Sequence, residues 1–323
     1  LTHPTIPMSF LNTLFGKGPS NEASQFEILR DDGLRAMQMG EMPYAEKCLL
    51  AALQLREDAQ TQSYLAEVYL RMERHEQALP LLETLAKQAD TPADVRLLLA
   101  QTQGELKLWA DERATCQALQ QELPDDARVL YLLAEAEYGL DDTFGAIAHL
   151  TQSLELRPDY RHPRWLRAQI LADMKQWNEV LADVEPLVDS DAENTSYLLL
   201  RAEALASLQQ PEAAVQDLEL VLSLNPYQRE AVLALGALYE QGSRWDKALA
   251  LYDEAIELQP DFAEAYKARG AVKLHLKDEL GAAEDLKRTL ELAPEKAADL
   301  SGEYTNVENE FNAQYRRMNP YGF

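Results

Sequence analysis

The residues that could do covalent chemistry are scattered through this chain of 323 residues and form no catalytic set. Gly16-Lys17-Gly18 lacks both the glycine five residues earlier and the Ser or Thr after the lysine that a phosphate-binding loop needs. Cys48 and Cys116 fall in apolar segments 68 residues apart, so we interpret them as core residues rather than nucleophiles or disulfide partners. Four histidines show no metal-ligand spacing: His75, His149, His162 and His275. We therefore predict no enzyme activity, no metal and no cofactor.

Binding is the chemistry that the sequence favours. Tyr131 and Trp165 accompany the densest positive cluster of the chain, and Trp, Tyr and Arg are the residues most often found at interaction hot spots. The cluster contains Arg128, Arg157, Arg161, His162, Arg164 and Arg167. We expect the aromatic side chains to contact an apolar group of a partner and the arginines to bind an acidic group.

The net charge narrows the class of partner. Lys and Arg number 30 against 55 Asp and Glu, and the net charge of −25 repels nucleic-acid phosphates and anionic lipids. We therefore predict no nucleic-acid and no membrane partner. The 46% of hydrophobic residues indicate a folded chain, and two cysteines fit a reducing compartment, so we expect a cytoplasmic location. Leu1 to Pro7 precede Met8 and show no signal-peptide pattern; whether they are native stays open.

A 34-residue period organises the elements that carry these residues. Prolines recur at multiples of 34: Pro124, Pro158, Pro226, Pro260 and Pro294. Small residues recur in a second register: Ala66, Ala100, Ala134, Ala168, Ala202, Gly236 and Gly270. A third register is mostly small: Ala78, Glu112, Ala146, Val180, Ala214, Ala248 and Ala282.

Each period predicts one hairpin of two helices. Two apolar-periodic stretches of about a dozen residues lie between successive prolines. A small residue in the first helix faces one in the second, so the two backbones approach closely, and proline ends the second helix. The aspartates after three of the prolines suit the N-cap of the next helix: Asp125, Asp159 and Asp261. A single hairpin cannot bury its apolar face, so the hairpins must stack.

This pattern resembles the tetratricopeptide repeat (TPR) family. The best match, Arg229 to Pro260, carries Val232, Leu235, Gly236, Tyr239, Ala248, Tyr252, Ala255 and Pro260. The resemblance implies an all-α fold, a right-handed α-solenoid of about eight TPR hairpins over residues 26–296. The repeats are placed at about 26–58, 59–92, 93–126, 127–160, 161–194, 195–228, 229–262 and 263–296. Glu112 and Val180 depart from the family's alanine, so we expect looser or shifted packing in repeats three and five.

In the family, the first helices form a concave wall and the fifth and ninth repeat positions point inward. These positions and the adjacent arginines give a candidate peptide-binding groove of Leu97, Gln101, Arg128, Tyr131, Glu135, Arg161, Arg164, Trp165, Gln169 and Leu199. The alternative is that Tyr131 and Trp165 only fill space between neighbouring first helices and that the arginines pair with acidic neighbours. The carboxylate clamp of chaperone-binding family members needs Lys and Asn at the fifth and ninth positions of one repeat, and no repeat has that pair.

Segments outside the repeats complete the predicted architecture. Residues 1–25 form an N-terminal extension with a linker over Gly16 to Ser20. Residues 297–318 have the apolar spacing of a capping helix, and 319–323 form a tail. The aromatic tail predicts weak self-association, the alternative being a frayed end. Pro80 and Pro186 fall inside second helices, as tolerated kinks or as hinges.

The function predicted from the sequence is a non-catalytic scaffold or adaptor. It would bind a protein or peptide segment with apolar and acidic groups in the concave groove. Two alternatives stay open: a regulatory sensor that responds to a peptide, and a substrate-docking accessory subunit of an enzyme or secretion complex.

The repeat register is testable by overpacking. Replacing Ala248 with Leu should lower the free energy of unfolding by roughly 1–3 kcal/mol, because the larger side chain forces the two helices apart. An unchanged melting temperature would show that the register is wrong.

Overall fold

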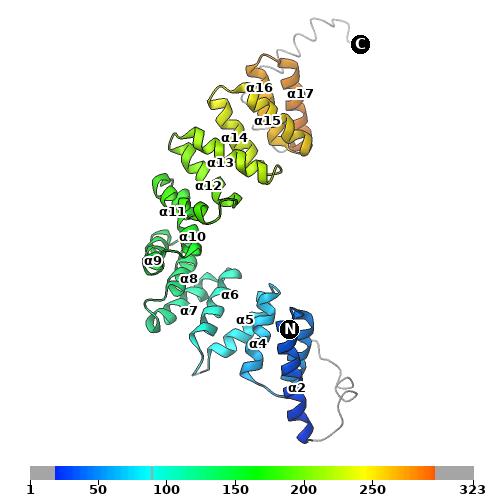
Figure 1. Cartoon of the computed structure of the whole chain (residues 1–323), viewed down its shortest axis with the longest axis vertical. Coiled ribbons are helices and arrows are strands. Elements are labelled where there is room, and N and C mark those ends of the chain that lie inside the picture. Colours follow the sequence, from blue (N-terminus) through cyan, green and yellow to red (C-terminus); the bar gives the residue numbers. More distant parts are fainter. Residues whose placement is uncertain (1–18, 89, 295–323) are drawn as a thin grey trace. The chain divides into compact units, whose positions relative to one another are not determined.

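The computed structural model describes residues 19–88 and 90–294, and every regular element in these residues is a helix. The predicted capping helix, the tail and residues 1–18 of the N-terminal extension lie outside them. The described chain forms two compact units, one ending at Leu166 and one beginning at Arg167 (Figure 1). Unit 1 contains α2 (Pro19–Gln38), α3 (Met42–Leu55), α4 (Ala59–Arg71), α5 (His75–Ala86), α6 (Ala93–Glu105), α7 (Trp109–Glu122), α8 (Ala127–Gly139), α9 (Thr143–Leu156) and the start of α10 (Arg161–Asp173). Unit 2 contains the rest of α10, α11 (Trp177–Ser190), α12 (Thr195–Ser207), α13 (Pro211–Leu224), α14 (Arg229–Gln241), α15 (Trp245–Leu258), α16 (Ala263–His275) and α17 (Glu279–Leu292).

The helices pair into the predicted hairpins, and the hairpins stack into an all-α solenoid. Within hairpins, α4 contacts α5 and α6 contacts α7 in unit 1, and α12 contacts α13 and α16 contacts α17 in unit 2. Between hairpins, α3, α5 and α7 in unit 1 and α11, α13 and α15 in unit 2 each contact the next helix. First helices of neighbouring repeats also touch, as α6 does α8 and α14 does α16. The first helix starts at Pro19, seven residues before the expected start of repeat one, so Pro19 and Ser20 are helical rather than part of the linker.

The helix ends follow the proline register, but the caps do not follow the predicted aspartates. Each second helix with a following proline ends two residues before it, as α7 ends at Glu122 and α15 at Leu258. The N-cap of α8 is Asp126, whose side chain accepts from the backbone N–H of Arg128, and the N-cap of α16 is Phe262. The predictions for Asp125 and Asp261 are therefore wrong by one residue, because helix φ and ψ begin one position later.

One left-handed residue closes the turn inside every hairpin of the described chain. Positive φ values of 55° to 67° recur every 34 residues at Glu73, Lys107, Asp141, Lys175, Gln209, Ser243 and Lys277. Glycine occupies the corresponding turn only in the first hairpin, at Gly40. The period thus fixes backbone conformation as well as side-chain size, and most turns accept the cost of a left-handed non-glycine residue.

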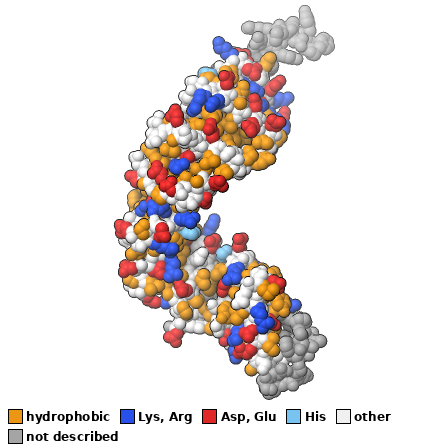
Figure 2. All heavy atoms as spheres, viewed as in Figure 1, with side chains coloured by type: hydrophobic (Ala, Val, Ile, Leu, Met, Phe, Trp, Pro, Cys, Tyr) orange, Lys and Arg blue, Asp and Glu red, His pale blue; other side chains and the backbone are white. Residues whose placement is uncertain are grey.

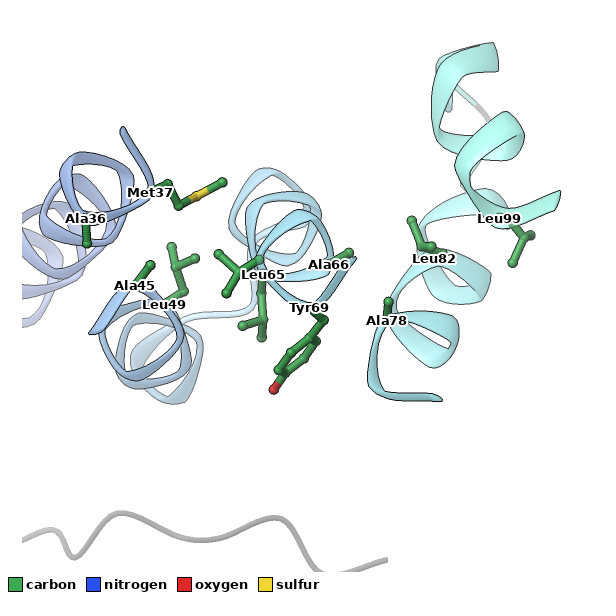
Figure 3. Close-up of a cluster of buried hydrophobic side chains, with 11 residues drawn as sticks. Ala36, Met37, Ala45, Leu49, Leu65, Ala66, Tyr69, Ala78, Leu82 and Leu99 are labelled. Atoms are coloured by element: carbon green, nitrogen blue, oxygen red, sulfur yellow. The ribbon is translucent and has the colours of Figure 1, made fainter. Parts of the chain in front are cut away.

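The two helices of a hairpin meet over small side chains, as the sequence predicted. Ala66 and Ala78 are fully buried between α4 and α5 (Figure 3). A Cβ atom built on Gly270 would lie 3.4 Å from the carbonyl oxygen of Ala282, so α16 and α17 are in backbone contact there. Figure 3 shows how Leu49 and Leu65 then continue the core from one hairpin to the next.

Tryptophans at the start of second helices join successive hairpins. Trp109, the first residue of α7, fills the space that a side chain at Gly139 of α8 would need. Trp245, the first residue of α15, stacks on His275 of α16 with ring centroids 3.7 Å apart. These large contacts bury the apolar face that one hairpin cannot cover by itself.

Three ion pairs with buried aspartates and partly exposed arginines link the helices of hairpins in unit 2. Each joins an arginine of the first helix to an aspartate 16 residues later in two parallel hydrogen bonds of 2.5–2.8 Å. The pairs are Arg167–Asp183, Arg201–Asp217 and Arg269–Asp285, and all three aspartates are buried. The first pair assigns Arg167, which the sequence placed in a partner-binding cluster, to the interior of its own hairpin.

Two second helices contain an internal proline. Helices α5 and α11 continue through Pro80 and Pro186, and both proline side chains are exposed. Whether either position acts as a hinge stays a prediction.

Over the residues that the structure describes, none of the helices combines the length and the apolar character needed to cross a bilayer.

The buried Arg–Asp pair gives a stability prediction. Replacing Arg201 with Met should lower the free energy of unfolding by roughly 3 kcal/mol, since Asp217 would be left buried without its partner. Replacing both residues with apolar ones, Arg201→Met with Asp217→Leu, should recover most of the loss in a denaturant titration.

Arg288→Met is the matched control, because the Arg288–Glu291 pair is exposed. It should barely change the melting temperature. If Arg201→Met is equally mild, the pair does not hold the hairpin together.

Candidate functional site

An open pocket of about 480 Å³ lies in unit 1 between the first helices of repeats three and four. We call it the α6–α8 pocket. Its lining is Asp94, Leu97, Leu98, Gln101 and Glu105 of α6, Arg128, Tyr131, Leu132 and Glu135 of α8, Tyr160 of the α9–α10 loop and His162 of α10. On each of α6 and α8, the lining residues recur at spacings of three and four, so they share one helix face.

Three rings form one wall of the α6–α8 pocket. The ring centroids of Tyr131 and Tyr160 are 5.8 Å apart, and His162 lies 6.0 Å from Tyr131 and 5.7 Å from Tyr160. All three contacts are tilted or edge-on, the arrangement that aromatic pairs prefer. Burial raises the pKa of both Tyr131 and Tyr160, so neither phenol is activated as a nucleophile.

Arg128 is neutralised by two aspartates. Its guanidinium makes two hydrogen bonds to Asp126, of 3.1 and 2.7 Å, and a third of 3.1 Å to Asp94. These pairings raise the pKa of Arg128, first through the hydrogen bonds with Asp126. The arginine therefore has its charge and its geometry already committed inside unit 1.

Glu105 and Glu135 leave the pocket acidic. Glu135 is half-buried, and burial together with the charge of Glu105 raises its pKa to about 7. Within residues 19–88 and 90–294, neither carboxylate has an ion-pair partner. The two glutamates therefore repel each other across a pocket whose one lining arginine is occupied by the aspartates.

Glu112 lies buried behind this region, on α7. It is fully buried, both carboxyl oxygens lack a hydrogen-bond partner in the described residues, and burial raises its pKa to about 9. Room for it comes from Gly104 of α6, where an added Cβ would lie 2.8 Å from Glu112 Oε1. The looser packing expected in repeat three stays a prediction, but the missing side chain at Gly104 explains how the large residue fits.

The structure brings together five of the ten predicted groove residues. Leu97, Gln101, Arg128, Tyr131 and Glu135 line the α6–α8 pocket. Three others in unit 1 do not line it: Arg161 is exposed, while Arg164 and Trp165 are half-buried. Gln169 and Leu199 belong to unit 2, and their part in a groove stays a prediction.

Sequence reasoning missed Tyr160 and Glu105 because it counted only the fifth and ninth repeat positions. Tyr160 is the last residue of its repeat, outside both helices. The 34-residue period could have indicated Tyr160, because the equivalent position three repeats later is the aromatic residue Phe262, which is buried. Glu105 ends α6 four residues after Gln101, and a helical extension of the predicted stripe would have reached it.

Charged side chains of both signs and two thiols are the remaining chemical groups of the described surface and core. Figure 2 shows acidic and basic side chains interspersed over the visible surface. In the described ranges, no three His, Cys, Asp or Glu side chains converge where they could hold a metal ion. Cys48 and Cys116 are buried free thiols, as predicted, and burial raises the pKa of both.

Comparison with known proteins agrees with the fold. Family models described as "Tetratricopeptide repeat" match residues 64–127 and 195–228, and one described as "TPR repeat" matches 237–276. A solved tetratricopeptide repeat protein from Parabacteroides merdae superposes with a TM-score of 0.56 at 15% identity, covering 77% of this chain and 99% of that one. This likeness concerns the fold.

Two curated relatives show similarity over parts of their length. A "UPF0162 protein" of Xylella fastidiosa is 36% identical over 86 residues, which are 25% of this chain and 31% of the relative. A "DnaJ homolog subfamily C member 7 homolog" of Schizosaccharomyces pombe is 23% identical over 232 residues, 66% of this chain and 49% of the relative. The chain thus matches half or less of the length of either protein.

Glu112 gives a pH prediction. The unfolded carboxyl ionises near its ordinary value of about 4.5, whereas the folded one holds its proton up to a pKa of about 9, so stability is lost as pH rises between these values. The Glu112→Gln variant should lose this part of the pH dependence. In denaturant titrations between pH 5 and 8, the unfolding free energy of the variant minus that of the wild type should increase by roughly 1 kcal/mol per pH unit.

The exposed Glu57 provides the control, because Glu57→Gln removes the same charge from the surface. Its stability curve should run parallel to that of the wild type. A parallel curve for Glu112→Gln as well would mean that Glu112 ionises normally in the folded chain.

Proposed function

The chain is a tetratricopeptide repeat protein, and we propose that it is a non-catalytic scaffold that binds a segment of a partner protein in the α6–α8 pocket. Proteins of this family generally act in protein–protein interaction. The observation that carries the proposal is the ring wall of Tyr131, Tyr160 and His162, which stands beside exposed Leu98 in an open pocket. Aromatic side chains at the centre of a hollowed surface are the usual anchors of an interface.

The proposal keeps the apolar part of the predicted partner at this pocket. The acidic part has less support there, since Arg128 is already paired with Asp126 and Asp94. Arg161 is exposed and lies outside the pocket, so an acidic group bound by it stays a separate prediction. Self-association through the tail, which lies outside the described residues, and a cytoplasmic location also stay predictions.

A peptide-responsive sensor and a docking subunit of an enzyme or secretion complex would use the same pocket. In a sensor, binding of the segment would change the dimensions of the chain. In a docking subunit, binding would hold a substrate for turnover by a second protein. A scaffold requires neither effect.

Peptide display tests the proposal directly. Twelve-residue random peptides selected on the wild-type chain should bind the Tyr160→Ala variant at least tenfold more weakly, a loss of about 1.4 kcal/mol typical of an anchoring residue. Fluorescence anisotropy with the synthetic peptides measures the affinities, and circular dichroism melting shows that the variant is folded.

Phe144→Ala is the matched control, because Phe144 is an aromatic of the same unit that is 77% exposed and does not line the pocket. It should leave the affinities unchanged. A selection in which Tyr160→Ala and Phe144→Ala behave alike would contradict binding at the α6–α8 pocket.

A further inference from the structure

We propose that the α6–α8 pocket receives a basic side chain, lysine or arginine, from the bound segment. This inference rests on the proposed function and adds the chemistry of the partner residue that enters the pocket. It differs from the acidic partner group that the arginines of the sequence predicted.

The charges of the lining favour a cation. Asp94, Glu105 and Glu135 contribute three carboxylates, and Arg128 is the only Lys or Arg among the residues that line the pocket. Arg128 divides its hydrogen bonds between Asp94 and Asp126, which lies outside the lining. Glu105 and Glu135 then remain without an ion pair in the described chain, and a cation between them would relieve their mutual repulsion.

Because Glu135 is half-buried, an ion pair with it would contribute more to binding than an ion pair with an exposed glutamate. A carboxylate that is partly removed from water loses hydration, which is why its pKa rises to about 7. Tyr131 already makes a hydrogen bond with this carboxylate, and a basic group placed beside it would add the ionic partner that the ionised form lacks. Exposed glutamates elsewhere on this acidic chain stay hydrated and gain less from the same contact.

The rest of the lining fits the other parts of a basic side chain. The rings of Tyr131 and Tyr160 stand beside the carboxylates, and aromatic rings attract ammonium and guanidinium groups within about 6 Å. Leu97, Leu98 and Leu132 offer apolar surface to the aliphatic stem. The volume of about 480 Å³ accommodates one long side chain with its flanking backbone.

Other occupants leave a charge unmatched. An acidic side chain would meet two glutamates, and the one arginine nearby is already bound to two aspartates. An apolar side chain would contact the rings and the leucines, as the apolar part of the segment does in the proposed function, but it would bury Glu135 further without giving it an ionic partner, and this costs free energy. A basic side chain alone satisfies the carboxylates, the rings and the leucines together.

The test uses the full chain and the selected twelve-residue peptides. Peptides whose binding requires Tyr160 are sequenced to find the position at which a basic residue recurs. One of these peptides is resynthesised with that basic residue replaced by a neutral isostere, norleucine for lysine or citrulline for arginine. Affinities at 150 mM salt are measured for the wild type and for the double variant Glu105→Gln/Glu135→Gln. The matched control Glu57→Gln/Glu83→Gln removes the same charge from two exposed positions outside the pocket.

We expect lysine or arginine to be fixed at one position of the Tyr160-dependent peptides. The double variant should bind the basic peptide at least tenfold more weakly than the wild type, while the control variant changes its affinity less than threefold. The neutral isostere should bind wild type and double variant alike, so that the effect is specific to the pair of pocket glutamates and the basic group.

Two results would overturn the inference, and they separate it from the proposed function. In the first, the Tyr160-dependent peptides have a neutral or acidic residue at the fixed position, or their affinities do not change in Glu105→Gln/Glu135→Gln. The proposed function would then stand, but the inference of a bound basic side chain would be wrong. Peptides that bind without needing Tyr160 would remove both. Equal losses in the double variant and the surface control would show general attraction to an acidic chain and also overturn the inference.

Discussion

The fold depends on the close approach of two helices over a small residue. A Cβ at Gly270 would lie only 3.4 Å from the Ala282 backbone, and Ala66 and Ala78 meet between α4 and α5 with no exposed surface. This contact sets the distance between the helices of a hairpin. The distance in turn sets which side chains reach the next hairpin, as Trp109 does at Gly139 and Trp245 at His275. The position of the α6–α8 pocket depends on the same spacing, because α6 and α8 are neighbouring first helices.

The residues that fill the contact between the two helices of a hairpin differ from repeat to repeat, while the helix pairing is kept. Repeat three exchanges the small residue for Glu112 and makes room at Gly104. Repeat seven pairs Gly236 with Tyr252, whose hydroxyl donates to Glu240 at 2.8 Å. In unit 2, Arg–Asp pairs with buried aspartates cross between the two helices in addition to the small residues. Burying charge gains little stability on balance, so we attribute to these pairs a role in the register of the hairpin.

The sequence predicted the repeats well, and five of its ten groove residues line the α6–α8 pocket, whose binding of a partner stays a prediction. Periodic prolines and small residues reveal the hairpins because each arises from a local steric requirement that recurs in every repeat. The predicted caps at Asp125 and Asp261 missed by one residue, since the N-cap depends on where φ and ψ become helical and not on residue type alone. Leu97, Gln101, Tyr131 and Glu135 were found because they share a register. Tyr160 was missed because its loop has no helical period. For Arg128 the structure has the alternative that the sequence left open, pairing with acidic neighbours, and which aspartates it binds depends on side-chain geometry across two repeats.

Glu112 also changes the charge that the folded chain carries. The formal net charge of −25 counts every glutamate as ionised. With its pKa raised to about 9, Glu112 keeps its proton at pH 7, and this group alone makes the folded charge −25 + 1 = −24. Opening of the α6–α7 hairpin would hydrate that carboxyl and release the proton to water. Local unfolding of the third repeat is therefore an acid-releasing step, and proton concentration acts on it as a ligand that binds the closed form.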